Sequence, residues 1–419
     1  MGSDVSTAED CNLNNTGNLS TAEVAQFFLF SPFEKATRVS ILPVILAIGL
    51  IGNAAFLFTI AQVRSMRTAT NFYLSNLAVS DSVFLSIAIV TKLREFSIYG
   101  VPNSAPLLGR LGCVLGEVTK YLFSFAGMIF ITFISLERYI AVCHPLRHRL
   151  INGSGRSVKL ITLCWLVALL LAMFVIPANL KFIQFCLSWP EDEPELYSEY
   201  PTIIGRCAGL GEWAYQLFHL TQTIPFFVAF FGNAFFYTRI LLKLHQRDTD
   251  EDRKRVIRIR NQVATMLVAN GTVFFLTTTP FEVTSFILFV EGFLDSEIIP
   301  QNIRPFLFEV NRILLYINSA INPIVYTVTN ARYRRAFRKA FMLNKCSSRQ
   351  LRNTTLSSVT PAQNAYQLNG VDPSIPIPAS EANRTGGPFL NHGFDFNEHT
   401  GTKENENAPG VFHVPHQTE

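Results

Sequence analysis

The sequence predicts an all-α membrane protein, in which seven transmembrane helices form a bundle and a short amphipathic eighth helix follows. Of the 419 residues, 49% are hydrophobic, 16% are charged and 37 are phenylalanines, which is unusual for a soluble protein. One crossing takes about 20 apolar residues. Seven mainly apolar stretches of about this length or more lie near residues 40–63, 71–93, 111–142, 158–178, 213–244, 258–291 and 305–328. They are too long and too uniformly apolar for the strands of a membrane barrel.

Charged residues predict how these helices are oriented. Lysine and arginine gather in the loops after the first, third, fifth and seventh stretches. The loop after the fourth stretch is acidic, with Glu191, Asp192, Glu193, Glu195 and Glu199. Because cytoplasmic loops are enriched in lysine and arginine, we expect a multi-pass plasma-membrane protein with its amino terminus outside the cell.

Two segments next to the bundle have their own character. Residues 1–39 are expected to be extracellular and glycosylated at Asn14 and Asn18, which begin Asn-x-Ser/Thr triplets. Residues 40–330 hold the seven helices. Residues 331–345 are expected to form the eighth helix on the inner leaflet, because their aromatic side chains share a face opposite the arginines.

The last part of the chain, residues 346–419, is rich in Ser, Thr, Asn, Pro and Gly, which predicts a disordered cytoplasmic tail. Cys346 is a candidate for palmitoylation, which would tie the start of this tail to membrane lipid. Hydroxyl groups such as those of Thr354 and Ser357 are candidates for phosphorylation. Arrestin is the partner expected for the phosphorylated tail.

Polar residues and prolines interrupt the apolar stretches. Asn53, Asp81, Asn318 and Asn322 lie deep within them and must find partners in a medium without water, so we expect them to face one another. Prolines inside helices remove a backbone hydrogen bond and cause bends. Those expected to act in this way are Pro177, Pro225, Pro280 and Pro323. Bent helices around a polar interior indicate a protein that moves.

Several of these residues belong to short motifs, one for each of several predicted helices. The motifs are Gly52-Asn53, Leu77-Ala78-Val79-Ser80-Asp81, Cys113, Glu137-Arg138-Tyr139, Trp165 and Asn322-Pro323-Ile324-Val325-Tyr326. Each alone is weak evidence, but their order is specific, as is the spacing of 25 residues from Cys113 to Arg138. Over residues 40–345 the chain resembles the rhodopsin-like G-protein-coupled receptors.

The resemblance implies a switch at the cytoplasmic end of the bundle. In that family Glu137 would hold Arg138 at rest, and activation would free the arginine to contact a Gα subunit while Tyr326 moves beneath it. The residues expected to take part in activation are Asp81, Glu137, Arg138, Tyr139, Phe274, Pro280, Asn318, Asn322, Pro323 and Tyr326. The alternative is that Glu137 and Arg138 are interfacial charges that reach toward water.

Three residues depart from the family pattern. Thr278 stands where the family usually has an aromatic residue, so an aromatic toggle cannot be assumed. Gly127 stands where a hydroxyl usually contributes to a sodium site near Asp81, which leaves sodium binding open. Arg260 replaces an acid found in some relatives, so Arg138 is expected to have Glu137 as its ionic partner.

The resemblance also implies a disulfide from Cys113, at the outer end of the third helix. Cys186 and Cys207 flank the acidic loop, and all three face an oxidising compartment. Either could pair with Cys113. Cys207 is favoured because it lies 18 residues before Pro225, nearer the usual span.

Charged residues occupy the depth at which the family binds its ligands. Lys120 lies 18 residues before Arg138, about 27 Å along a helix. Amine receptors resembling this chain carry an aspartate there, so an amine ligand is not expected. Tyr316 occupies the position of the opsin lysine, so retinal is not expected either.

The charges in this region allow two interpretations. The residues concerned are Glu117, Lys120, Glu282, Glu309, Arg312 and Tyr316. The acids and bases either neutralise one another or contact the ligand, since buried charges need partners. With the acidic loop as a lid, they favour a peptide with charged and apolar parts, such as a basic peptide that ends in arginine and an aromatic amide.

The function that we expect is therefore a receptor for an extracellular, neuropeptide-like ligand that activates heterotrimeric G proteins. The alternatives are a receptor for a lipid or small acidic ligand, and a decoy that binds peptide without coupling. No clustered metal ligands and no nucleophile with its base appear, so an enzyme, a metal site and a cofactor are not expected. A transporter would show internal repeats, which are absent from the sequence. Nucleic acid is not an expected partner.

Overall fold

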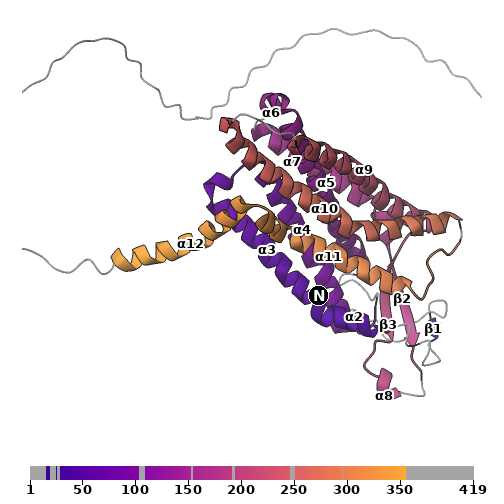
Figure 1. The fold of residues 1–419 in the computed structure, drawn as a ribbon. Helices are drawn as coiled ribbons and strands as arrows, with labels where there is room; N and C mark the ends of the chain where they lie inside the picture. Colours follow the sequence, from indigo (N-terminus) through magenta and orange to yellow (C-terminus); the bar gives the residue numbers. More distant parts are fainter. Residues whose placement is uncertain are drawn as a thin grey trace, which may run out of the picture. The chain divides into compact units, whose positions relative to one another are not determined.

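The computed structural model describes residues 16–18, 25, 29–102, 109–151, 154–190, 194–245, 251–294 and 296–354. In these ranges seven long helices form a bundle (Figure 1). They are α3 (Leu42–Gln62), α4 (Ala69–Arg94), α5 (Gly109–Cys143), α7 (Ser154–Met173), α9 (Glu212–His245), α10 (Glu251–Leu294) and α11 (Arg304–Thr329). Each overlaps one of the predicted stretches, and the predicted fold class is confirmed.

Six helical stretches in the described part of the chain are long and apolar enough to cross a membrane. The remaining long helix, α11, is more polar, but its polar side chains are turned into the bundle. Glu309, Asn311, Asn318 and Asn322 are all buried. This face meets polar partners on neighbouring elements, among them Arg38 and Asp81, so α11 lies in the same bundle although its composition differs from that of the other six.

The first helix begins earlier than predicted. Ser31 caps α2 (Pro32–Ala36) with a capping box, in which Glu34 donates its backbone N–H to the serine hydroxyl and its carboxylate accepts from the Ser31 N–H. A π-helical turn, η3 (Thr37–Ile41), leads directly into α3. The helical run thus starts at Pro32 rather than near residue 40.

The predicted bend at Pro177 is wrong. Helix α7 ends at Met173, and Pro177 lies in a separate 3₁₀ turn, η6 (Ile176–Asn179). Proline fixes a backbone angle that suits the first turn of a helix, and its missing N–H costs nothing there. The other predicted prolines, Pro225, Pro280 and Pro323, do lie inside helices.

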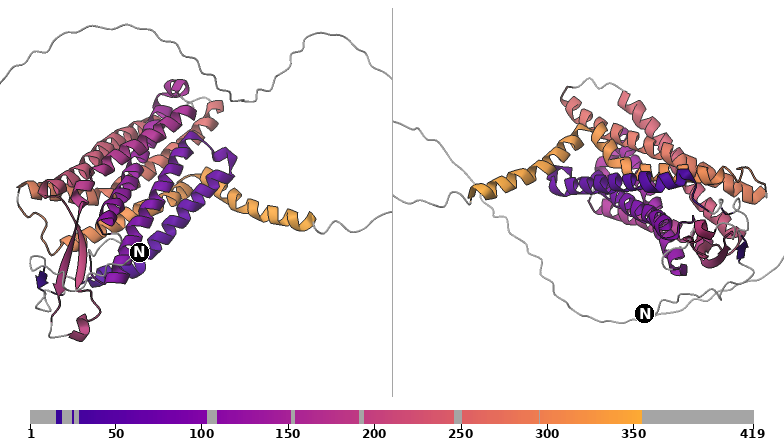
Figure 2. Two further views of the ribbon diagram at one scale, coloured as in Figure 1. Left: turned by 180° about the vertical axis from the view of Figure 1, so that it is seen from behind. Right: turned by 90° about the horizontal axis from the view of Figure 1, so that it is seen from below.

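A small sheet covers one end of the bundle, which we call the sheet end. Strands β2 (Lys181–Ser188) and β3 (Ile203–Ala208) form an antiparallel hairpin, and β1 (Thr16–Asn18) pairs in parallel with β2. The hairpin loop contains α8 (Pro194–Tyr197) and a ring stack of Trp189 on Tyr197. The view from behind shows the hairpin running from this end of the bundle away from the helices (Figure 2).

The opposite end, the α12 end, carries two further helices. Helix α6 (Pro145–Ile151) follows α5, and α12 (Ala331–Thr354) follows α11. Helix α12 begins at the predicted residue and is longer than predicted. It packs against α3 through buried Tyr333 and through Phe341, whose ring lies 5.5 Å from that of Phe58. The chain beyond Thr354, where most of the predicted tail lies, is outside the described residues.

Aromatic side chains fill the centre of the bundle. Phe226, which is fully buried, packs against Phe275 and Phe230 at ring separations of 5.8 and 6.1 Å. Trp165 stands edge-on to Phe130 and donates its indole N–H to the Asn76 side chain at 3.0 Å. These contacts join α4, α5, α7, α9 and α10 in one hydrophobic core. The core fixes the positions of the helices that carry the buried polar residues.

A disulfide joins the hairpin to the bundle, between Cys113 on α5 and Cys207 on β3. This is the pairing that the sequence favoured. The bond closes a loop of 94 residues. Loops of this size give disulfides a stabilising effect of about 2–5 kcal/mol.

We expect Cys207→Ser to lower the thermal unfolding midpoint of the purified chain in detergent by several degrees, because the unfolded chain regains the freedom of this loop. Cys143→Ser is the control, since Cys143 is not disulfide-bonded. Equal midpoints for Cys207→Ser and Cys143→Ser would contradict this account.

Candidate functional site

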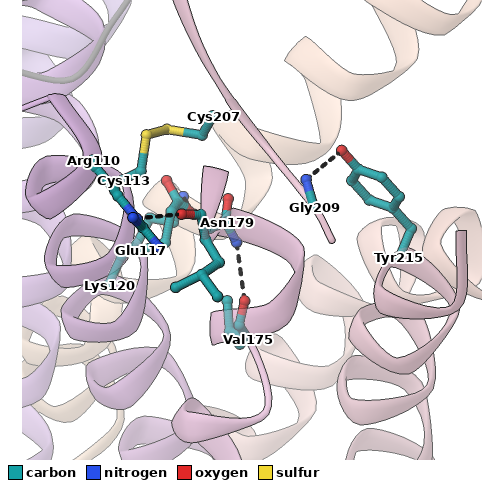
Figure 3. The surroundings of a disulfide bond; sticks show 10 residues. Arg110, Cys113, Glu117, Lys120, Val175, Asn179, Cys207, Gly209 and Tyr215 are labelled. Atoms are coloured by element: carbon teal, nitrogen blue, oxygen red, sulfur yellow. Dashed lines mark hydrogen bonds and ion pairs between the residues drawn. A yellow bond between two sulfur atoms is a disulfide. The ribbon is translucent and has the colours of Figure 1, made fainter. Parts of the chain in front are cut away.

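The mouth of the bundle at the sheet end is lined by an ion pair on α5. The Lys120 ammonium lies 2.5 Å from the Glu117 carboxylate, and both side chains are partly exposed. Lys120 also lies over the Tyr121 ring, 4.9 Å from its centre. Both charged residues follow Cys113 along α5, beneath the disulfide (Figure 3). Glu117 and Lys120 therefore neutralise each other at the sheet end of the bundle.

The turn that enters the hairpin is held close to this mouth. Arg110 donates to the carbonyl of Leu180 at 3.1 Å, and the backbone N–H of Gly209 donates to the Tyr215 hydroxyl at 2.9 Å (Figure 3). The hairpin is thus attached to α5 by a covalent bond and a hydrogen bond, and to α9 by a second hydrogen bond. It is a fixed lid.

A second group of charges crosses from η3 to α11. Arg38 is only 2% exposed and donates to Glu309 at 3.0 Å, while Arg312 donates to the other Glu309 oxygen at 3.2 Å. The Arg38 guanidinium also lies over the Phe30 ring, 4.5 Å from its centre. Glu309 is thus enclosed by two arginines. Of the two interpretations of Glu309, this geometry favours neutralisation.

Glu282 on α10 is the acid that differs. It is 6% exposed, and its Oε2 atom has no hydrogen-bond partner among the described residues. One turn further along α10, Ser285 is hydrogen-bonded to His219 of α9 at 2.9 Å. Tyr316, the remaining predicted pocket residue, is buried against Phe84, with ring centres 6.0 Å apart.

Glu282 lines a cavity of about 30 Å³ inside the bundle. The lining comes mainly from α4, α5, α10 and α11 and includes Asp81, Gly127, Gln222, Phe274, Thr278, Glu282 and Asn318. Phe274, predicted to belong to the switch, thus forms part of this wall. The cavity connects the region of the predicted ligand pocket to the polar residues below it.

The buried polar residues below the cavity contact one another in part, as predicted. Asn322 donates to the Asp81 carboxylate at 2.6 Å. Asn53 instead donates to two backbone carbonyls, of Gly49 and Ser319, at 3.0 and 3.1 Å. Asn53 thereby joins α3 to α11, and Asp81 joins α4 to α11.

Arg138, at the α12 end, is held by two groups. Its guanidinium lies 3.5 Å from the Glu137 carboxylate and hydrogen-bonds to the hydroxyl of Thr70 on α4. Tyr139, the third residue of the motif, stacks on Phe236 of α9 and hydrogen-bonds to His144 at 3.2 Å. The Glu137–Arg138 pair expected from the sequence is present, and Thr70 is an additional partner.

Two tyrosines lie near this end of the core. Tyr326 is buried between Phe56 and Tyr333, at ring separations of 5.4 and 5.9 Å. Tyr237 of α9 hydrogen-bonds to Ser135 of α5 at 2.8 Å. In the structure these tyrosines therefore brace neighbouring helices.

Sequence reasoning missed three partners, Arg38, Thr70 and Gln222. Arg38 falls in the segment expected to precede the bundle, and Thr70 and Gln222 are ordinary polar residues in apolar surroundings. Their proximity to Glu309, Arg138 and the cavity depends on how the helices pack. A local sequence pattern does not predict such packing. Asn14 lies outside the described residues, as does the side chain of Cys346, and Asn18 ends β1.

Comparison with known proteins identifies the family. The model of the 7 transmembrane receptor (rhodopsin family) matches residues 52–326. Neuromedin-U receptor 2 of Mus musculus is 28% identical over 305 residues, which cover 70% of this chain and 72% of the relative. The growth hormone secretagogue receptor type 1 of Rattus norvegicus is 28% identical over 73% of this chain and 80% of its own length. The thyrotropin-releasing hormone receptor of Homo sapiens is 27% identical, over 71% and 76%. The chain belongs to the rhodopsin family of seven-transmembrane receptors.

Proposed function

We propose that the chain is a plasma-membrane receptor that binds an extracellular peptide with a basic group and activates heterotrimeric G proteins. The observation that carries this proposal is Glu282, a buried carboxylate that lines the cavity and whose Oε2 atom has no hydrogen-bond partner in the described part of the chain. A cationic ligand group would satisfy it. The names of the relatives, which refer to neuromedin U, a growth hormone secretagogue and thyrotropin-releasing hormone, favour a peptide.

In this proposal the sheet end faces outside the cell. Arginines and lysines crowd the α12 end, as in cytoplasmic segments. Residues 1–39 would then be extracellular, with glycosylation at Asn14 and Asn18. Residues 331–345 of α12 would lie on the inner leaflet, because this helix has one apolar face and one rich in arginine.

The inner surface would carry the regulatory partners. Palmitoylation of Cys346 would hold the end of the leaflet-bound segment against lipid. Residues 346–419 would form a tail that binds arrestin after phosphorylation. Palmitoylation and arrestin binding would be independent of how the ligand is bound.

Activation follows from a difference in ligand affinity between two arrangements of the bundle. Binding at Glu282 acts on α10 two residues from Pro280, where the backbone lacks a hydrogen bond. Outward movement of the α12 end of α10 would open a cavity beside Arg138. The arginine would then leave Glu137 and Thr70 for the Gα subunit, and Tyr326 would leave Phe56 for the space beneath it.

The charges of the mouth make a small acidic ligand the weaker candidate. Such a ligand needs an available cation, but Lys120 is paired with Glu117 and Arg312 with Glu309. A basic ligand needs an available acid, which Glu282 supplies. The peptide reading therefore agrees better with the geometry than the alternatives from the sequence do.

We expect Glu282→Gln to weaken an activating basic peptide by about 10–100-fold, because a buried hydrogen bond to a charged group is worth about 1.5–3 kcal/mol. Glu117→Gln should weaken it less, since Lys120 already neutralises Glu117. The measurement is the peptide concentration that half-maximally drives Gα nucleotide exchange, with exposed Glu297→Gln as the control. Unchanged peptide potency in Glu282→Gln would contradict the contact between Glu282 and the basic group of the peptide.

We expect Gly271→Ala to raise basal nucleotide exchange several-fold. A Cβ at Gly271 of α10 would overlap the Tyr237 hydroxyl, so the tyrosine must leave Ser135 and the resting contact between α9 and α5 is lost. Gly232→Ala is the matched control, because a Cβ there meets no atom within 4 Å. If both variants keep the basal rate of the unmodified chain, Tyr237 does not stabilise the resting state.

A further inference from the structure

Glu282 and Asp81 line the same cavity. The cavity is undivided because the residues between these two acids have small side chains or none. Thr278 lies one turn from Glu282 on the same face of α10, and both line the cavity. Gly127 of α5 contributes no side chain, and a Cβ built there would come within 4.0 Å of the Asp81 carboxylate. Because Thr278 is short and Gly127 has no side chain, two carboxyl groups from different helices share one space.

Four polar groups that are unpartnered within the described ranges surround this space: two oxygens that only accept, one hydroxyl that can donate or accept, and one amide nitrogen that donates. Glu282 Oε2, Thr278 Oγ1 and Asn318 Oδ1 are buried without a hydrogen-bond partner among the described residues, and each residue lines the cavity. Gln222 adds an amide whose nitrogen is likewise unpartnered in this part of the chain. All four side chains are more than nine-tenths buried. A group with several N–H donors, placed among these side chains, would satisfy the oxygens that lack a partner.

A guanidinium supplies what these atoms lack. It carries five N–H donors in a plane, keeps its charge at every physiological pH, and sheds water more readily than an ammonium. The cavity of about 30 Å³ has room for about two water molecules, which together occupy nearly the same space as one guanidinium group. The apolar walls include Phe123, Phe274 and Leu315, and they would enclose the stem that carries the group.

We propose that this cavity is a guanidinium subsite, in which an arginine side chain of the ligand lies between Glu282 and the Asn318 layer. The identity of the carrier rests on the function proposed above, whereas the subsite itself does not. Binding there would place a ligand cation directly beside α10 and α11. The ligand cation would then share one cavity with Asp81, whose carboxylate accepts from Asn322.

The first test uses methylguanidinium as the probe and the purified full-length chain in detergent. At about 10 mM and constant ionic strength, methylguanidinium should raise the thermal unfolding midpoint by about 2 °C or more relative to N-methylurea, its neutral analogue. The difference should disappear in Glu282→Gln and in Thr278→Phe, which fills the cavity, and should persist in Glu297→Gln. Glu282→Gln conserves shape, so it keeps the test valid if Thr278→Phe does not fold.

Two results would overturn the subsite: equal midpoints with methylguanidinium and N-methylurea, or a difference that survives in Glu282→Gln. This assay contains no G protein and no peptide, so its failure is separate from a failure of the receptor function. The carrier is tested by replacing arginine with citrulline in an activating peptide. The loss of potency should be at least tenfold in the unmodified receptor and small in Glu282→Gln, and equal losses in both would exclude the arginine.

Discussion

A carboxylate buried inside a helix bundle must be compensated, and this constraint organises the receptor. Removing a charge from water is so costly that it persists only beside an opposite charge or hydrogen-bond donors. Glu309 meets the requirement with Arg38 and Arg312, and Asp81 meets it with Asn322. Glu282 has one oxygen that meets no donor in the described part of the chain. Glu309 and Asp81 thereby hold helices together, and in the proposed function Glu282 is the acid to which the ligand contributes a partner.

The same constraint connects the two ends of the molecule. Glu282, the cavity and Asp81 form a polar column along α10, α4 and α11, and Asn53 extends it to α3. At the α12 end, Arg138 is satisfied by Glu137 and by Thr70 of α4. In the proposed mechanism a ligand cation that enters at the sheet end changes the electrostatics of this column, and α10, which contains Pro280, responds by bending. In that mechanism the resting and active arrangements satisfy the same buried groups in two different ways.

Most of the helices and motif residues could be predicted from the sequence, because apolar length and short motifs are local properties. The start of the first helix was placed too late, since Ser31 and Glu34 form a capping box in a polar stretch where hydropathy is uninformative. The end of α7 was placed too late because Pro177 continues the apolar run after the helix has ended. The roles of the charged residues were left open for a different reason. Arg38 and Glu309 are 271 residues apart, and only packing decides that they pair while Glu282 Oε2 meets no donor among the described residues.

The most direct measurement of the central claim is Gα nucleotide exchange in membranes that contain the full-length chain, challenged with peptides of differing charge. The account predicts that peptides with an exposed arginine drive exchange, and that Arg138→Ala abolishes exchange while peptide binding remains. Exchange that persists in Arg138→Ala would contradict the switch. Activation by neutral or acidic ligands alone would contradict the role given to Glu282, and would leave the fold and its family unchanged.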